Sequence, residues 1–501
     1  MSPQPDSTEP TRRERPSFSF ARRNGATVVE WDGPTARVAY REGASPQALV
    51  ELKRFLGGAA LSMQAYPPEQ FDQLLQRLYE HGGSNARQVA ADISEELDLR
   101  QIAEELGEPE DLLESEDDAP VIRLINALLT EAVKENASDI HVEPLENELM
   151  VRFRVDGVLR EVLAPERRVA GLIVSRIKVM AKLDIAEKRL PQDGRISLRV
   201  AGRPVDVRVS TLPSNHGERV VLRLLDKQAG RLDLKQLGMN DQTQELMEDL
   251  IQRPHGILLV TGPTGSGKTT TLYAALSRLN DRSRNIMTVE DPIEYDIDGI
   301  GQTQVNSKVD LTFARGLRAI LRQDPDVVMV GEIRDLETAQ VAVQASLTGH
   351  LVLATLHTNS AIGAVTRLRD MGVEPFLLAS SLIGVLAQRL VRMLDPATRE
   401  PYTATEAECL VFGRKPARMP TFYRPAAGVT ETAGGYRGRS GIYELVAVDD
   451  TLRELIHQGA SEQAMLDHAR QRYPAIGDDG WNKVCSGQTS VEEVLRVTRQ
   501  D

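Results

Sequence analysis

Short apolar runs alternate with helix-forming segments through the second half of the chain, from about Leu237 onward. Residues 255–261 read HGILLVT, residues 327–330 read VVMV and residues 350–356 read HLVLATL. Continuous apolar runs of this length are typical of parallel strands that are buried on both faces. The pattern therefore predicts a doubly wound α/β domain over residues 237–501.

A second domain is expected over residues 119–236, where the pattern changes to alternation of apolar and polar positions. It runs through four segments: residues 148–155, 195–200, 203–211 and 218–225. Such alternation is typical of antiparallel strands with one solvated face. Asp156-Gly157, just after the first segment, is a hairpin signal. One helical face ahead of the strands is apolar: Val121, Ile125, Leu128, Leu129 and Ala132. We therefore expect an α+β domain.

The first 118 residues divide into three parts. Residues 1–16 are rich in Pro, Ser and charge, and we expect a disordered tail. Residues 17–90 combine a strand-like run at 26–30 with a helical one at 71–79, which predicts a small α/β-mixed domain. The third part, residues 91–118, is acidic: its positions 93–118 hold 12 acidic residues and one basic residue. This charge favours a solvated linker over a specific binding tail.

Composition narrows the class of protein. The 501 residues are 41% hydrophobic and 27% charged, as in ordinary globular proteins of two to four domains. The net charge of −13 lies mostly in the acidic linker, so the nearly neutral remainder argues against a nucleic-acid-binding surface. The two cysteines, Cys409 and Cys485, argue against a disulfide framework. No signal-peptide core is present, and we expect the longest apolar stretch, residues 375–387, to be a buried helix.

Residues 262–269 read GPTGSGKT, the pattern of a phosphate-binding loop. Its glycines let the backbone turn its N–H groups toward phosphate oxygens. Lys268 supplies a cation for the β- and γ-phosphates, and the Thr269 hydroxyl suits Mg²⁺, which prefers hard oxygen ligands. The flanking strand and helix place the phosphates at a helix N-terminus. The predicted nucleotide-binding residues are Gly262, Pro263, Thr264, Gly265, Ser266, Gly267, Lys268, Thr269 and Thr270.

Carboxylates and a histidine follow other apolar runs. Glu332 comes where a strand can deliver an acid to Mg²⁺ and the attacking water. Glu290, Asp291 and Glu294 cluster at another strand end, where they could position water or metal or simply form a polar loop. His357 ends a third run, at the edge where ligand sites form in α/β sheets. It is either structural or a γ-phosphate sensor.

Four arginines stand among mostly apolar neighbours: Arg208, Arg223, Arg318 and Arg322. A guanidinium matches phosphate oxygens bidentately, which makes each a candidate phosphate ligand. Most arginines are only surface cations, so the residues alone leave both interpretations open.

Several longer segments resemble known proteins. Residues 321–335, 285–295 and 348–359 look like the Walker B, Asp-box and His-box signatures of the secretion ATPase superfamily, in its order and spacing. Further matches resemble the GspE family of bacterial type II secretion ATPases: residues 175–189, 192–195, 217–219 and 436–444. The resemblance is strong over residues 118–394 and 436–500 and weak before them.

The resemblance implies a fold and residue roles. The ATPase domain would be RecA-like, the α+β domain PAS-like, and the first domain a docking module. Thr269 and Glu332 would hold Mg²⁺, Glu294 would orient or deprotonate water, and His357 would be the His-box residue. Phosphates would be contacted by the four arginines, some across domain or subunit boundaries: Arg208, Arg223, Arg318 and Arg322.

It also implies a function. The chain would be a cytoplasmic ATPase, peripheral on the inner membrane, that uses ATP and Mg²⁺ to drive pseudopilus assembly and protein export across the outer membrane. Its partners would be five further copies in a homo-hexamer, the cytoplasmic domain of a GspL-like membrane protein and a GspF-like platform protein. No nucleic acid is expected, and the membrane would be contacted only through partners.

One segment departs from the GspE pattern. GspE proteins commonly carry a tetracysteine zinc subdomain before the segment that corresponds to residues 436–444. Four thiolates at paired spacing would be a strong zinc signal. Residues 395–435 contain only Cys409. We therefore expect no zinc, and a degenerate insert that folds by packing or stays loose.

Three alternative functions remain at this stage. Within the superfamily the chain could be a type IV pilus assembly ATPase. A RecA-like DNA motor would need a basic channel, which the nearly neutral bulk charge disfavours. A regulatory subunit that binds nucleotide without hydrolysis would not need Lys268, Glu294 and Glu332 together.

Overall fold

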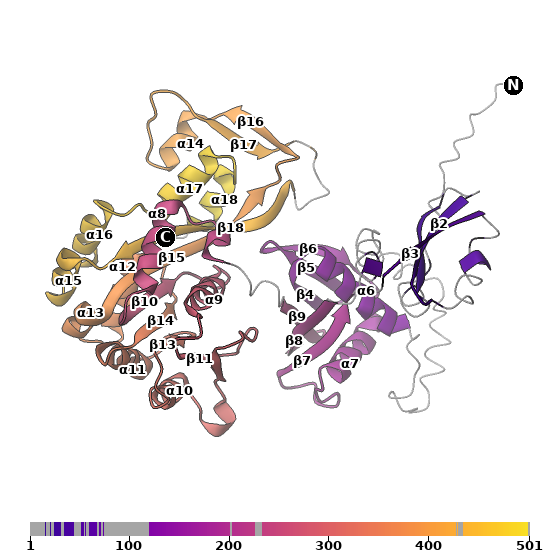
Figure 1. The fold of residues 1–501 in the computed structure, drawn as a ribbon, viewed down its shortest axis with the longest axis horizontal. Coiled ribbons are helices and arrows are strands. Elements are labelled where there is room, and N and C mark those ends of the chain that lie inside the picture. The colour runs from indigo at the N-terminus through magenta and orange to yellow at the C-terminus, as the bar shows by residue number, and fades with distance from the viewer. Residues whose placement is uncertain are drawn as a thin grey trace. The chain divides into compact units, whose positions relative to one another are not determined.

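The structure is a computed structural model. It describes residues 120–200, 203–225, 233–426, 428 and 434–498, with scattered residues between 16 and 74. The described residues form two compact units: an N-terminal unit that reaches Leu224, and a C-terminal unit that runs from Leu225 and also takes in Asp156–Val158 (Figure 1). Three predicted segments lie wholly or mostly outside the described residues: the tail over residues 1–16, of which only Pro16 is described, the acidic linker over 91–118, and most of the helix expected at 71–79.

The C-terminal unit is built on a seven-stranded sheet. In order across the sheet, the strands are β12 (Gly301–Gln304), β11 (Ile286–Glu290), β13 (Val327–Val330), β14 (Leu351–Leu356), β10 (Gly256–Thr261), β15 (Leu382–Leu394) and β18 (Tyr436–Ala447). All neighbours pair in parallel except β15 and β18, which are antiparallel. The predicted α/β core is therefore confirmed.

Both faces of this sheet are buried, which explains the unbroken apolar runs. Along β10, Ile257 and Leu259 enter one hydrophobic cluster, whereas Leu258 and Val260 enter another. Other strands of the sheet and eight of the described helices also contribute to the two clusters. These helices are α8 (Asp241–Ile251), α9 (Lys268–Leu279), α10 (Phe313–Ile320), α11 (Leu336–Leu347), α12 (Ala361–Asp370), α13 (Pro375–Ser381), α15 (Asp450–His457) and α16 (Glu462–Arg470).

The prediction of one buried helix over residues 375–387 is wrong in its second half. Helix α13 ends at Ser381, and β15 begins at Leu382. Both halves are apolar because both are buried, so composition alone cannot separate them. The apolar continuity of Leu382–Ala387 reflects a strand that pairs with β10 on one side and β18 on the other.

The insert before β18 packs against the C-terminal helices. It contains an antiparallel pair, β16 (Arg399–Thr403) and β17 (Thr421–Pro425), and the helix α14 (Glu406–Val411). Phe422 is buried edge-to-face on Trp481 of α17 (Ile476–Cys485), 5.5 Å between ring centroids. The cluster also takes in α18 (Val491–Thr498). Cys409 is buried here as a free thiol, 3.9 Å from the Met419 sulfur, and the expected lack of zinc stays a prediction.

The N-terminal unit contains a six-stranded sheet. Its strands, in spatial order, are β6 (Val158–Leu163), β5 (Leu149–Val155), β4 (Ala137–Pro144), β9 (Gly217–Leu225), β8 (Arg203–Ser214) and β7 (Gln192–Val200). Helices α6 (Pro120–Lys134) and α7 (Ala170–Met180) supply apolar side chains to the cluster on one face of it. The expected helix, alternating strands and Asp156-Gly157 hairpin are confirmed; both turn residues have positive φ, 49° and 84°.

A smaller sheet precedes this one in the chain. It consists of β1 (Ala26–Trp31), antiparallel to β2 (Thr35–Arg41), and β3 (Ala60–Tyr66), parallel to β2. Its hydrophobic clusters are separate from that of the six-stranded sheet. The strand expected at 26–30 is confirmed, whereas the domain boundaries stay predictions.

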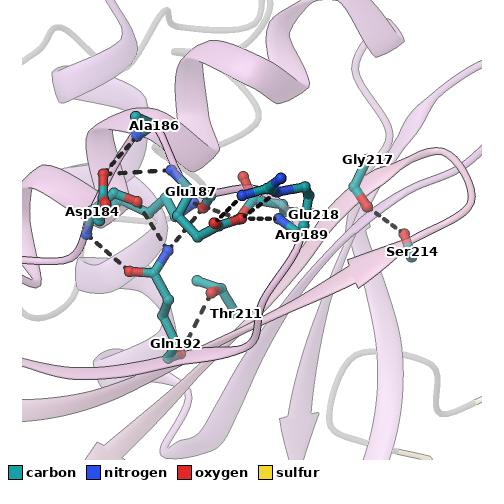
Figure 2. Close-up of polar contacts among 10 residues, drawn as sticks. Asp184, Ala186, Glu187, Arg189, Gln192, Thr211, Ser214, Gly217 and Glu218 are labelled. Atoms are coloured by element: carbon teal, nitrogen blue, oxygen red, sulfur yellow. Dashed lines mark hydrogen bonds and ion pairs between the residues drawn. The ribbon is translucent and has the colours of Figure 1, made fainter.

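A buried lysine holds the loop between α7 and β7, inside the segments that resemble the GspE family. The Lys178 ammonium donates to the Glu187 carbonyl (2.7 Å) and to the Glu218 carboxylate (2.5 Å). The Gln192 amide donates to the Asp184 and Glu187 carbonyls, both at 2.9 Å, as Figure 2 shows. A lysine whose side chain is only 1% exposed is tolerated because these acceptors replace its water.

Across the described residues, no helix is both long enough and apolar enough to cross a bilayer.

Candidate active site

The predicted phosphate loop joins β10 to α9. Gly262 and Gly267 have φ values of +150° and +88°, which side-chain-bearing residues rarely adopt. The helix starts at Lys268, so the first N–H groups of α9 have no partner within the helix and face the loop. Pro263, Thr264, Gly265 and Thr269 are exposed or half-buried, whereas Ser266 is buried. A backbone cradle at a helix N-terminus fits a nucleotide phosphate.

Lys268 lies over this loop. Its ammonium donates to the carbonyls of Gly262 (2.8 Å) and Pro263 (3.1 Å) and lies 3.5 Å from His357 Nδ1. Burial lowers the pKa of Lys268 to about 8; the Glu332 carboxylate opposes this shift, and the Arg389 cation adds to it. Such a desolvated cation fits a polyanion, because an incoming phosphate restores the charge compensation that water no longer provides.

Glu332 and His357 lie beside Lys268. Glu332 follows β13. The residue before it, Gly331, is held by a hydrogen bond from its N–H to the Val289 carbonyl (2.8 Å). The Glu332 side chain is 16% exposed; it forms an ion pair with Arg334 and lies 3.5 Å from His357 Nε2. Burial lowers the pKa of His357, and the Lys268 cation lowers it further. The imidazole is therefore neutral at pH 7, with Lys268 on one ring nitrogen and Glu332 on the other.

The Asp-box carboxylates separate in space. Glu290 is 3% exposed and accepts from Thr288 Oγ1 (2.5 Å), Gln302 Nε2 (3.1 Å) and the Tyr273 hydroxyl. These contacts fix the end of β11 against α9. Glu294 is half-buried, and its N–H donates to the Tyr273 hydroxyl at 3.4 Å. Asp291 is exposed and raises the pKa of Arg334, after the larger effect of Glu332. The described contacts of Glu290 join it to the protein itself; a part of Glu290 in positioning water or metal, like the water-orienting role of Glu294, stays a prediction.

No described contact joins any of the four candidate arginines to Lys268. Arg318, on α10, donates to Glu337 of α11 at 2.6 Å, and Arg322 donates to the Arg318 carbonyl at 2.8 Å. Arg208 on β8 and Arg223 on β9 belong to the N-terminal unit, where Arg223 donates to Asp139 at 2.9 Å. Any contact of these arginines with phosphate stays a prediction.

Sequence reasoning missed two cations at the site. Arg334 lies inside the segment that resembles Walker B, two residues after Glu332, but the pattern assigns it no role. Arg389 is 4% exposed, and its Nη2 donates to the carbonyl (3.0 Å) and side-chain oxygen (3.2 Å) of Asn359. Arg389 could have been found only by placing residues 382–394 in a strand next to β10.

The depressed pKa of Lys268 predicts a pH dependence of nucleotide binding. Below about pH 8 the ammonium is charged and attracts phosphate, and above it the charge is lost. ADP affinity should therefore fall by about tenfold between pH 7 and pH 9, because only the protonated fraction binds well. Fluorescent ADP titrations across this range measure the effect. The Lys268→Arg variant, which stays charged, should show a flat profile; parallel profiles for the two proteins would contradict the assignment.

Comparison with known proteins assigns the family. Residues 114–496 match the family described as Type II/IV secretion system protein, and residues 15–79 match a domain family of GSPII protein E. The chain belongs to the Type II/IV secretion system protein family. It is 64% identical over 501 residues to the Type II secretion system protein E of Pseudomonas aeruginosa, covering 100% of this chain and 99% of that one. It is 62% identical over 486 residues to the Type II secretion system ATPase E of Vibrio cholerae, covering 96% of each.

A solved structure extends the family likeness to the fold. The pilus retraction motor PilT, determined with bound ADP, is similar with 26% identity and a TM-score of 0.52 over 74% of this chain and 96% of that one. The ATPase DotB of Legionella pneumophila shares the fold at 22% identity and a TM-score of 0.57, covering 75% of this chain and 95% of that one. The multidomain α/β ATPase architecture predicted from the sequence is thereby confirmed, and the PAS-like assignment stays a prediction.

Proposed function

We propose that this chain is the ATP hydrolase of a type II secretion system, which couples Mg-ATP hydrolysis to pseudopilus assembly and protein export across the outer membrane. The observation that carries the proposal is the convergence of Lys268, His357 and Glu332 at the ends of three adjacent strands. Full-length similarity to relatives named for type II secretion supports the pathway. It disfavours the pilus assembly and DNA motor alternatives.

The chemistry assigned to these residues follows from their charges. The loop N–H groups and Lys268 hold the β- and γ-phosphates and stabilise the negative charge that develops on the transferred group. Glu332 and the Thr269 hydroxyl would provide hard oxygen ligands for Mg²⁺, which would neutralise phosphate charge when bound. His357 faces Glu332 with Nε2 and the Lys268 ammonium with Nδ1, so its ring links these two charged groups beside the γ-phosphate. Glu294 orients the attacking water.

The arginines complete the charge balance in this proposal. In it Arg318 on α10 and Arg322 just after α10 contact the phosphates, within the chain or from a neighbouring copy, and Arg208 and Arg223 are the other two phosphate ligands. A homo-hexamer and movement of the N-terminal unit, with its PAS-like domain, then control turnover. Residues 17–90 dock on the cytoplasmic domain of a GspL-like protein, and a GspF-like platform receives the motion. Peripheral inner-membrane localisation follows from these partners.

ATP hydrolysis by the purified full-length chain tests the proposal. It should require Mg²⁺, stop with EDTA and rise when the cytoplasmic domain of the GspL-like partner is added. Light scattering with a non-hydrolysable ATP analogue should give the mass of six chains. Double-stranded DNA serves as the comparison arm and should leave the rate unchanged. Lack of turnover with the partner present, or strong stimulation by DNA alone, would refute the proposal.

A further inference from the structure

Gln388 of β15 contacts both the phosphate loop and the helix that follows it. Strand β15 pairs in parallel with β10, where Thr261 aligns with Ala387. The side chain of the next residue, Gln388, is buried, with 1% of the residue exposed. Its Nε2 donates to the Ser266 carbonyl at 2.7 Å, and its Oε1 accepts from the Thr271 hydroxyl at 2.9 Å. One amide thus ties the end of the loop to the first turn of α9.

The loop and Gln388 fit closely together. A Cβ at Gly262 would lie 2.5 Å from the Gln388 carbonyl oxygen, and one at Gly267 would lie 3.2 Å from Gln388 Nε2. The lack of side chains at these two positions therefore lets the loop rest against β15, besides allowing their positive φ values.

The two bonds need a side chain that both donates and accepts. The Ser266 carbonyl oxygen accepts a hydrogen bond from Gln388, and the Thr271 hydroxyl donates one to Gln388. A glutamine amide does both at once, whereas a carboxylate or a thioether of the same length does not. Both partners are buried at this point, so a lost bond leaves a polar group without water to replace it.

The adjacent residue makes an equivalent contact with the loop after β14. Arg389 donates to Asn359, two residues beyond His357. Consecutive residues of one strand therefore hold the two loops that carry Lys268 and His357. Backbone N–H groups bind phosphate well only when their directions are fixed before the ligand arrives.

We infer that Gln388 is a positioning residue of the nucleotide site, which holds the Ser266 and Thr271 segments so that the loop N–H groups point at the phosphates. The inference deepens the proposed function and rests on it. Gln388 does not touch the nucleotide; it acts through the backbone of the loop.

Gln388→Met tests this role, because it keeps the length of the side chain and removes both polar atoms. In the full-length chain, ADP affinity should fall by about ten- to hundredfold, as expected when buried partners lose their bonds. Hydrogen exchange of residues 262–272 in the nucleotide-free protein should become faster. The melting temperature without nucleotide should also fall, and by more than in Gln244→Met, the same substitution on α8, where a half-buried amide donates to Glu248 (2.8 Å), because Ser266 and Thr271 lose buried bonds. ADP affinity is therefore compared at a temperature at which both variants are folded.

Thr271→Val removes one of the two contacts and should weaken ADP binding by a smaller factor. The double variant should bind ADP about as Gln388→Met does, because the Thr271 contact is already lost. ADP affinity of Gln388→Met within about twofold of the parent, or unchanged exchange of the loop, would overturn the inference. Should Gln388→Met fail to fold, parental affinity in Thr271→Val overturns it. Failure of the parent chain itself to bind ADP would instead reject the proposed function.

Discussion

Lys268→Ala should abolish ATP hydrolysis and ADP binding without destabilising the nucleotide-free protein. The ammonium is partly desolvated, and its described partners are two carbonyls of its own loop and His357. Removing it takes away the cation nearest the phosphates, for which a loss of at least about a hundredfold in turnover is expected. The same change relieves the cost of holding a charge away from water, so unfolding should not become easier.

Three measurements separate these effects. Turnover and ADP affinity should both be lost, whereas the melting temperature without nucleotide should equal or exceed that of the parent. ADP should then no longer raise the melting temperature of the variant, since stabilisation by a ligand requires binding. Lys235→Ala, an exposed lysine on the turn Leu234–Leu237, is the matched control and should behave like the parent. Near-normal hydrolysis by Lys268→Ala would falsify the assignment of the loop.

Glu332→Gln should stop hydrolysis while ADP binding persists. The amide keeps the shape of the side chain but loses the negative charge that faces Arg334 and His357. An amide is a poorer ligand for Mg²⁺ and cannot balance the cations, so turnover should drop by about a hundred- to a thousandfold. ADP is held mainly by the loop and Lys268, so its affinity should change by less than about tenfold.

Single-turnover hydrolysis and ADP titration on the same preparation check this split. Glu245→Gln, on the solvent side of α8, is the control for the loss of one charge and should hydrolyse ATP normally. Parallel losses of binding and turnover in Glu332→Gln would mean that Glu332 holds the loop together and does not serve the chemistry.

The sheet and the positions of Lys268, Glu332 and His357 could be predicted because each depends on local signals. Runs buried on both faces are continuous in sequence, and the ends of parallel strands fall at one edge of a sheet. The loop pattern adds glycines at positions where positive φ is required. These three signals together place the three residues near one another without any knowledge of distant contacts.

Other features depend on contacts that no local pattern encodes. The burial of Glu290 depends on Gln302 and Tyr273, which come from other elements. The switch from helix to strand at Leu382 depends on the pairing of β15 with β10 and β18, and the same pairing brings Gln388 and Arg389 to the site. The sequence prediction ended its helix at residue 387 and assigned no element to Gln388 and Arg389, whose significance comes from their neighbours across the sheet.

Strand β15 is long enough to connect two regions of the C-terminal unit mechanically. It continues past Gln388 to Leu394, six residues further, or about 20 Å of extended chain. At that end the Arg392 guanidinium pairs with Glu493 of α18 (2.5 Å), and the Leu394 N–H donates to the Gln488 carbonyl (2.8 Å). Because β18 is bonded along this length, the strand resists stretching. Strand β15 therefore gives a continuous hydrogen-bonded connection between the strand beside the phosphate loop and the last two described helices.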